Sequence, residues 1–275
     1  MTAANEQIRA YYHALYGAWG RQHWWPARNR FEVIVGAYLT QNTSWRNVEI
    51  ALRQMRAARK LHLAAMRTIP LDQLEALIRP TGYFRQKAAR LKTFVAFVDK
   101  AYGGSLQRMF AQPTDKLRQE LLALNGVGPE TADSILLYAG QHPVFVVDAY
   151  SRRILQRHRI ADPKMSYEEL RQLFEQSLSE VAKAPAKVTR TSDIVIPSLA
   201  HSPSAMSLAR RSPLVQIYND THGLIVATGK QYCLKAEPRC QHCPLRTFLP
   251  DDGPRCEARM MGSSGGHHLQ PRARL

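Results

Sequence analysis

Cysteine is the residue whose type and spacing in this chain most directly indicate chemistry. All four cysteines fall near the carboxyl end, with the spacing Cys233-x6-Cys240-x2-Cys243-x12-Cys256. Thiolates grouped in one short stretch are typical of a four-cysteine iron–sulfur cluster or of a structural zinc site. Disulfides are disfavoured if the protein is cytoplasmic. The spacing therefore predicts a metal centre and leaves iron–sulfur and zinc open.

A single aspartate, Asp148, follows the apolar run Val144–Val147 and directly precedes a helical pattern that begins at Ala149. An aspartate in this place is a good helix N-cap. A carboxylate beside a buried segment can also act as a general base or stabilise positive charge that develops during a reaction. The position alone favours capping.

A tight Gly-Val-Gly turn joins two apolar helical runs within Leu121–Leu136. Glycines permit positive φ and close approach to the backbone, and Pro129 opens the second helix, whose first N–H groups are unpaired. This arrangement suits a phosphate, although a plain packing corner between two helices would use the same turn. The residues predicted to meet the phosphate are Asn125, Gly126, Val127, Gly128, Glu130 and Thr131.

Three of the four tryptophans gather early in the chain, at Trp24, Trp25 and Trp45. Their indole rings can stack on a nucleobase or serve as ordinary core packing. Between them the amides Gln41 and Asn42 end an apolar helical run. An amide in that place can cap a neighbouring helix or be presented to a partner.

The charge balance favours a polyanionic partner. The chain has 38 Lys and Arg against 22 Asp and Glu, a net charge of +16. Between residues 44 and 100 there are 12 Lys and Arg against 4 Asp and Glu, so this segment carries +8. Nucleic acid is the leading candidate partner, with a solvated basic surface as the alternative. No leader peptide and no long apolar run is present, which predicts a cytoplasmic protein without membrane contact.

Short amphipathic helices must position these residues. Apolar residues recur at helical spacing over 31–39, 114–123, 129–139, 150–158 and 166–176, and only 144–147 reads as extended. The predicted fold class is therefore all-α. Residues 183–213, rich in Ser, Pro, Ala and Arg, predict a flexible insertion, and the Gly- and Ser-rich residues 259–275 predict a disordered tail.

Taken together, the motifs resemble the helix-hairpin-helix DNA glycosylase superfamily in its endonuclease III branch. The segments that carry the resemblance are LNGVGPETADSIL, VVDAYSRR and the cysteine group with its Cys-Pro-Leu. The segments HWWP and FEVIVGAYLTQNTSW most resemble the 3-methyladenine glycosylase subgroup. The resemblance spans roughly residues 31–243. It implies two helical domains: a six-helix barrel with the hairpin at 25–138, and a discontinuous domain at 1–24 and 139–258 that ends in an iron–sulfur loop.

The resemblance also implies roles for individual residues. Asp148 would be the catalytic carboxylate facing the sugar of an extruded nucleotide, Trp24, Trp25 and Trp45 would line the base pocket, and Gln41 or Asn42 would enter the vacated duplex space. The four cysteines would hold a [4Fe-4S] cluster, with zinc as the alternative. The family spaces its last two cysteines by x5, so the x12 before Cys256 is a departure.

A second departure concerns strand cleavage. Members of the family with lyase activity have a lysine at the position of Glu130, and a carboxylate cannot form the required imine. Lys116 or Lys87 would have to substitute. We therefore expect a monomeric, monofunctional DNA glycosylase of base excision repair that removes alkylated purines such as 3-methyladenine from damaged double-stranded DNA. The alternatives are an endonuclease III-like enzyme for oxidised pyrimidines or mismatched uracil and thymine, with or without AP lyase activity, and a lesion-binding protein without catalysis.

Overall fold

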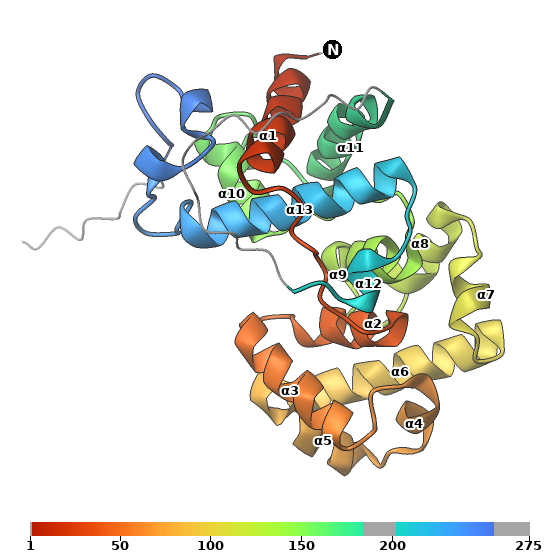
Figure 1. The fold of residues 1–275 in the computed structure, drawn as a ribbon. Coiled ribbons are helices and arrows are strands. Elements are labelled where there is room, and N and C mark those ends of the chain that lie inside the picture. Colours follow the sequence, from red (N-terminus) through yellow and green to blue (C-terminus); the bar gives the residue numbers. More distant parts are fainter. Residues whose placement is uncertain (1, 184–201, 256–275) are drawn as a thin grey trace, which may run out of the picture.

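The computed structural model describes residues 2–183 and 202–255, and it is built from helices (Figure 1). No β-strand occurs in these two ranges, which confirms the predicted all-α class. Residues 144–147 are extended, as expected, without pairing to another strand. No helix in the described ranges combines the length and apolar character that crossing a membrane requires.

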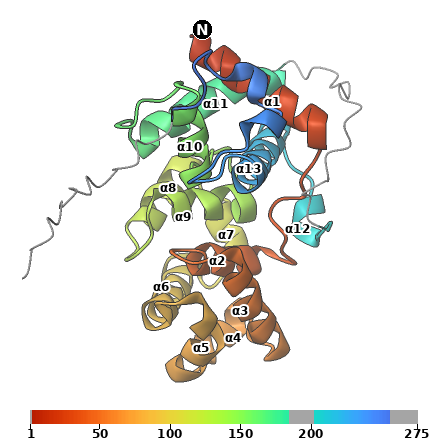
Figure 2. The same ribbon diagram turned by 90° about the vertical axis from the view of Figure 1, so that its left-hand side faces the viewer.

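The helices form two groups stacked one above the other (Figures 1 and 2). The lower group and the helices that connect it to the upper group are formed by one continuous stretch of the chain. They contain α2 (Arg30–Leu39), α3 (Trp45–Ala57), α4 (Leu63–Thr68), α5 (Leu71–Ile78), η1 (Arg79–Thr81), α6 (Phe84–Tyr102), α7 (Leu106–Phe110), α8 (Thr114–Leu122), α9 (Pro129–Ser134) and the π-helical η2 (Ile135–Gly140).

The upper group combines the beginning of the chain with its second half. Its elements are α1 (Ala3–Trp19), α10 (Ala149–Arg157), α11 (Tyr167–Lys183), α13 (Pro213–Gln231), η3 (Cys240–His242) and η4 (Arg246–Phe248). Helix α1 packs on α11 and α13, so residues far apart in the sequence share one core.

Apolar spacing explains the helices of the lower group. In α6 the residues Leu91, Phe94, Val95 and Val98 are each at most 3% exposed. Burying one such side chain contributes about 1.5–3 kcal/mol, so this stripe fixes the face of α6 that meets its neighbours.

Helices α10 and α13 lie against each other and set the geometry of the site. A Cβ atom on Gly229 of α13 would lie 2.3 Å from Cδ1 of Tyr150, so glycine is required for this close approach. Arg153 of α10 donates to the Gly229 carbonyl at 3.2 Å and to the Cys233 carbonyl at 2.7 Å. The start of α10 and the middle of α13 are thereby held in a fixed relation.

The segment expected as an insertion is partly described. Residues 184–201 and the expected tail 259–275 lie outside the described residues. Residues 202–213 contain the short helix α12 (Ala205–Leu208), which opens with a capping box between Ser204 and Ser207. Met206 is buried, and its N–H donates to the Ala27 carbonyl at 3.1 Å. One apolar side chain and a cap thus place this part of the segment beside the entry to α2.

Candidate active site

A cleft of about 880 Å³ lies between the loop after α2, the hairpin, the start of α10 and one face of α13. This volume is within the usual range of sites for small ligands. Most residues predicted from the sequence line it, namely Trp24, Trp25, Gln41, Asn42, Trp45, Gly126, Gly128, Glu130, Thr131 and Asp148. The cleft thus brings together segments that are more than a hundred positions apart.

Asp148 caps α10 and still presents one oxygen to the cleft. Its Oδ1 accepts hydrogen bonds from the N–H of Ser151 at 2.8 Å and from the Ser151 hydroxyl at 3.0 Å. Its Oδ2 lies 3.5 Å from Nε2 of His222, and the side chain is 12% exposed. Capping and a chemical role therefore do not exclude each other, because the two oxygens have different surroundings.

The surroundings of Asp148 favour its ionised form. Burial raises its pKa, but the hydrogen bond and charge of His222 and the two donors of Ser151 outweigh burial, so the pKa is below its ordinary value. On the other side of the ring, His222 Nδ1 lies 2.6 Å from the hydroxyl of Tyr138. Burial raises the pKa of Tyr138, which therefore keeps its proton within this hydrogen bond. The Nε2 atom of His222 then faces Asp148.

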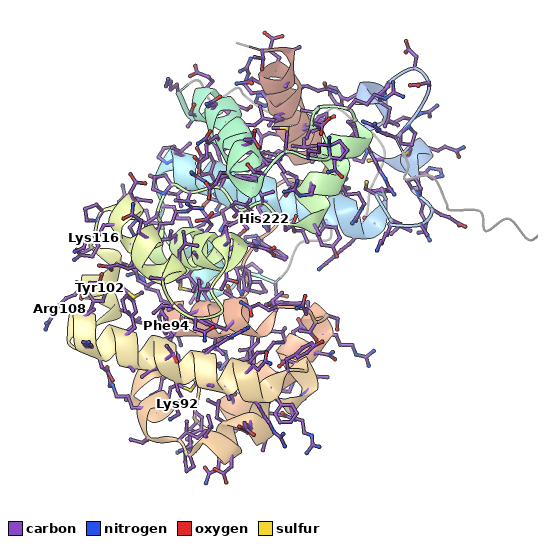
Figure 3. The ribbon with its side chains drawn as sticks, turned by 180° about the vertical axis from the view of Figure 1, so that it is seen from behind. Lys92, Phe94, Tyr102, Arg108, Lys116 and His222 are labelled. Carbon is purple, nitrogen blue, oxygen red and sulfur yellow. The ribbon has the colours of Figure 1, made fainter. Side chains whose placement is uncertain are left out.

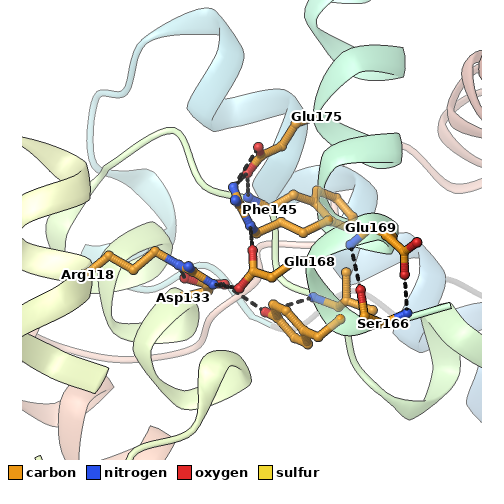
Figure 4. Close-up of polar contacts among 10 residues, drawn as sticks. Arg118, Asp133, Phe145, Ser166, Glu168, Glu169 and Glu175 are labelled. Carbon is orange, nitrogen blue, oxygen red and sulfur yellow. Dashed lines mark hydrogen bonds and ion pairs between the residues drawn. The ribbon is translucent and has the colours of Figure 1, made fainter. Parts of the chain in front are cut away.

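A polar network supports the extended segment in front of Asp148 (Figure 4). The hydroxyl of Tyr167 accepts from the N–H of Val147 at 3.4 Å and donates to Asp133 at 2.9 Å. Asp133 is fully buried and accepts from Arg118 at 2.7 Å. This chain of contacts fixes the backbone one residue before the carboxylate.

The same network continues along α11. Arg118 also pairs with Glu168 at 2.5 Å, and Arg171 pairs with Glu168 at 2.8 Å and with Glu175 at 2.7 Å. Glu175 in turn accepts the N–H of Phe145 at 2.9 Å. Helices α8, α9 and α11 and the segment 145–147 are therefore joined by one set of charges.

The three tryptophans stand edge to face. The ring centroids of Trp25 and Trp45 are 5.2 Å apart, and those of Trp24 and Trp25 are 5.8 Å apart. Trp24 and Trp25 are 9% and 6% exposed, whereas Trp45 is half-buried and its Nε1 donates to Glu49 at 2.9 Å. Trp24 and Trp25 therefore both pack in the core and line the cleft. The ring of Trp45 is the more accessible to a ligand in the cleft.

The two amide candidates for the duplex have different surroundings. Gln41 Nε2 donates to the Gly126 carbonyl and to the Thr131 hydroxyl, both at 3.0 Å, and Gln41 Oε1 accepts from Arg90 at 3.0 Å. Asn42 is exposed and has a left-handed backbone with φ of 52°. Gln41 therefore ties the loop to the hairpin, and Asn42 projects from it.

The hairpin uses its two glycines differently. Gly126 has φ of 77°, and a Cβ atom there would lie 2.0 Å from Nε of Arg90. Gly128 has an extended backbone, and a Cβ atom on it would meet nothing within 4 Å. Positive φ was expected to matter for both glycines, but Gly126 alone of the two adopts it, while the open space beside Gly128 leaves room for a phosphate. Val127 is buried beneath the turn and Asn125 is exposed on it.

Glu130 and Lys230 bring opposite charges into the cleft. Desolvation by the surrounding protein, and then the negative charge of Asp148, raise the pKa of Glu130 to about 7. Burial lowers the pKa of Lys230, against the pull of Asp148 and Glu49, and its Nζ lies 5.8 Å from the ring centre of Trp24.

The two lysines considered from the sequence do not line the cleft. Lys87 is buried in the lower group, where its Nζ donates to the carbonyls of Leu39 and Thr81 at 2.9 and 2.8 Å, and burial lowers its pKa to about 8. Lys116 lies on the outer face of α8, away from His222 (Figure 3).

Three cysteines share a separate cavity. Cys233, Cys240 and Cys243 line it together with Arg157, which donates to Cys233 Sγ at 3.3 Å. Within the described ranges no three His, Cys, Asp or Glu side chains are arranged to hold a metal ion. Cys256 lies outside the described residues.

Sequence reasoning missed two residues of the cleft. Neither His222 nor Lys230 is among the site residues predicted from the sequence. Both lie on one face of α13, with Val226 between them, and all three line the cleft. His222, Val226 and Lys230 follow one another at intervals of four residues, and this helical spacing would have been the signal that they share one face.

Three comparisons with known proteins agree with this geometry. Residues 35–180 match the family model described as "HhH-GPD superfamily base excision DNA repair protein". A protein of Methanocaldococcus jannaschii named "Putative DNA repair glycosylase" is 37% identical over 247 residues, which are 88% of this chain and 96% of that protein.

Solved structures are similar as well. The H. pylori 3-methyladenine DNA glycosylase bound to 1,N6-ethenoadenine superposes with a TM-score of 0.64 and 29% identity, covering 84% of this chain and 98% of that one. A trapped endonuclease III–DNA covalent intermediate has a TM-score of 0.64 at 23% identity and covers 90% and 96%, which supports the fold. The chain therefore belongs to the helix-hairpin-helix (HhH-GPD) superfamily of base excision repair proteins and is a DNA glycosylase of that family.

Proposed function

We propose that the enzyme is a monofunctional glycosylase that hydrolyses the N-glycosidic bond of cationic alkylated purines such as 3-methyladenine. The observation that carries this proposal is Asp148, which His222 and Ser151 keep ionised in a cleft lined by tryptophans. In the same cleft Glu130 stands where family members with lyase activity have a lysine. The H. pylori 3-methyladenine glycosylase, with 29% identity over most of both chains, supports the same substrate class.

The chemistry follows from the residues of the cleft. The target nucleotide leaves the duplex and enters the cleft, while Asn42 occupies the space left behind. Breaking the glycosidic bond develops positive charge on the sugar, which the Asp148 carboxylate stabilises, and Asp148 then accepts a proton from the attacking water. His222 and Ser151 hold that carboxylate in place and keep it ionised.

Recognition of an alkylated purine rests on its positive charge. An indole face attracts a cation, and this attraction is worth about 0.5–2 kcal/mol depending on desolvation. A fixed positive charge also weakens the glycosidic bond, so the base can leave without being protonated. Selection then depends mainly on binding.

We also propose that Cys233, Cys240, Cys243 and Cys256 hold a [4Fe-4S] cluster. Three observations support it: three thiols line one cavity, the Arg157 guanidinium donates to Cys233, and the Leu245 N–H donates to Cys243. Such a cluster would be structural and would tie the end of α13 to η3 and η4. Broad visible absorbance with four irons per chain is expected, and tetrahedral zinc without colour would refute it.

The experiment that tests the glycosylase proposal is release of free bases from methylated duplex DNA by the purified chain. We expect free 3-methyladenine from wild type, with strands that remain intact until alkali is added, and a single chain in solution. Strand cleavage without alkali, and an imine that borohydride traps, would instead support the AP lyase alternative. The amine of Lys230 in the cleft is the specific observation that favours that alternative.

A further inference from the structure

A second carboxyl group in the cleft has no part in the mechanism above. Glu130 follows Gly128 and Pro129 of the hairpin and lines the same cleft as Asp148 and the three tryptophans. Among the described residues, no hydrogen bond or ion pair engages its carboxyl group. It lines the cleft, so an extruded base would come into contact with it.

The two carboxyl groups have opposite surroundings. Asp148 is held ionised by His222 and Ser151, whereas Glu130 lacks such donors, is desolvated by the surrounding protein and experiences the negative charge of Asp148, which His222 offsets only in part. Two carboxyl groups whose pKa values are driven apart are the usual arrangement for one base and one acid. The other titratable groups around Glu130 are Tyr138, Tyr150, Tyr167, His222 and Lys230.

Resting on the proposed glycosylase function, we infer that Glu130 is a general acid that extends the substrates from cationic alkylpurines to neutral purine adducts. A neutral base leaves slowly as an anion, so one of its ring nitrogens must gain a proton. In this step the Glu130 carboxyl proton moves to a ring nitrogen, and the C1′–N bond breaks with its electron pair going to the base. Water adds to C1′ and gives its proton to Asp148.

The same group has the opposite effect on a cationic base. A neutral base in the cleft removes water from Glu130 and favours its protonated form, the form that donates. A fixed positive charge beside Glu130 favours the carboxylate, which attracts the base and has no proton to give. One side chain thus serves both classes of base in two protonation states, and the two reactions differ in their pH dependence.

The pH dependence gives the test. Single-turnover excision of 1,N6-ethenoadenine and of 3-methyladenine from duplex DNA is measured from about pH 5.5 to 8.5 with wild type and Glu130→Gln. For ethenoadenine, the wild-type rate should fall as pH rises, and the decline should begin above the value of about 7 that applies without DNA, because the neutral base favours the protonated form of Glu130. The variant should lose about 100-fold at the acid end and show no such decline, because general acids contribute at least this much. For 3-methyladenine the variant should show a much smaller loss that does not depend on pH, since that base needs no proton and loses only the attraction of the carboxylate.

Control measurements separate the possible failures. Glu75→Gln removes a carboxylate of α5, remote from the cleft, and should leave both reactions unchanged. An equal loss of both reactions in Glu130→Gln, or no loss of ethenoadenine excision, would overturn the acid role. Wild type that releases 3-methyladenine but no ethenoadenine overturns this inference and leaves the proposed function standing. Release of neither base overturns both.

Discussion

Replacing His222 should shift the pH dependence of excision rather than abolish activity at neutral pH. His222 Nε2 lies 3.5 Å from Asp148 Oδ2 in a place where the carboxylate is 12% exposed, so solvent screens the contact little. A hydrogen bond to a charged group is worth about 1.5–3 kcal/mol, but this 3.5 Å contact is too long to be a full one, so about 1.4 kcal/mol, which corresponds to one pKa unit, is expected. Removing this contact with His222→Phe should raise the pKa of Asp148 by about one unit.

The direction of the shift in the pH profile follows because the ionised form of Asp148 is the active one. In wild type the pKa of Asp148 is below its ordinary value, so activity and the stability contributed by this carboxylate persist to low pH and are lost only as pH falls through that value. In His222→Phe both losses should begin about one pH unit higher, while the rate near pH 8 changes little.

The assay is single-turnover release of 3-methyladenine at saturating enzyme, because this rate reports ionisations in the enzyme–DNA complex and not weakened binding. His222→Gln is the matched control, since its amide can donate to Asp148 and accept from Tyr138, and it should restore the wild-type profile. An acid limb that stays in place in His222→Phe, or one that His222→Gln fails to restore, would refute the reasoning.

Three further changes have expected outcomes. Asp148→Asn should abolish base release and keep binding to damaged duplex DNA, measured by excision and by fluorescence anisotropy on one preparation. Asp220 is 2% exposed and burial raises its pKa from 3.8 to about 6, so Asp220→Asn should increase the free energy of unfolding by about 3 kcal/mol at pH 8 and by nothing below about pH 3.5, measured with urea. Arg118→Met leaves the fully buried Asp133 unpaired and should cost about 3–5 kcal/mol in the same measurement.

Each of these has a contradicting result. Normal base release by Asp148→Asn would remove the carboxylate from the mechanism. A stabilisation by Asp220→Asn that is equal at pH 3.5 and pH 8 would show that ionisation is not its cause. For Arg118→Met, the double variant with Asp133→Leu should recover most of the loss, and a loss of under about 1 kcal/mol in the single variant would show that the pair is dispensable.

The fold was predictable where one face of a helix is apolar and the other polar. The expected helix over 31–39 corresponds to α2, and that over 150–158 corresponds to α10 shifted by one residue. Helix α13 was not singled out, since it is buried on nearly all sides from Val215 to Gly229 and thus has little periodic contrast. The short helix within residues 202–213 was not predicted either. Met206 is the apolar residue that anchors it, and one such residue gives too weak a pattern in a segment rich in Ser and Arg.

The site was predictable where its residues lie within one motif. Asp148 and Glu130 are each beside a distinctive turn or run, so their positions could be read from neighbouring residues. His222 and Lys230 could not be placed, because their role depends on where α13 crosses the cleft. The different surroundings of Gln41 and Asn42 depend on contacts with the hairpin, 85 positions away in sequence, and no local pattern reports such contacts.

The charge network between α8, α9 and α11 has a mechanical consequence. Two groups of helices joined by these paired charges resist hinge motion, since any opening that separates Arg118 from Asp133 would leave the fully buried Asp133 without its ion pair. We expect such an enzyme to keep its shape on DNA, so that the deformation needed for extrusion falls on the duplex. A weakly stacked lesion bends more easily than the base pairs around it. The protein would therefore bind there preferentially, by local DNA flexibility, before any base enters the cleft.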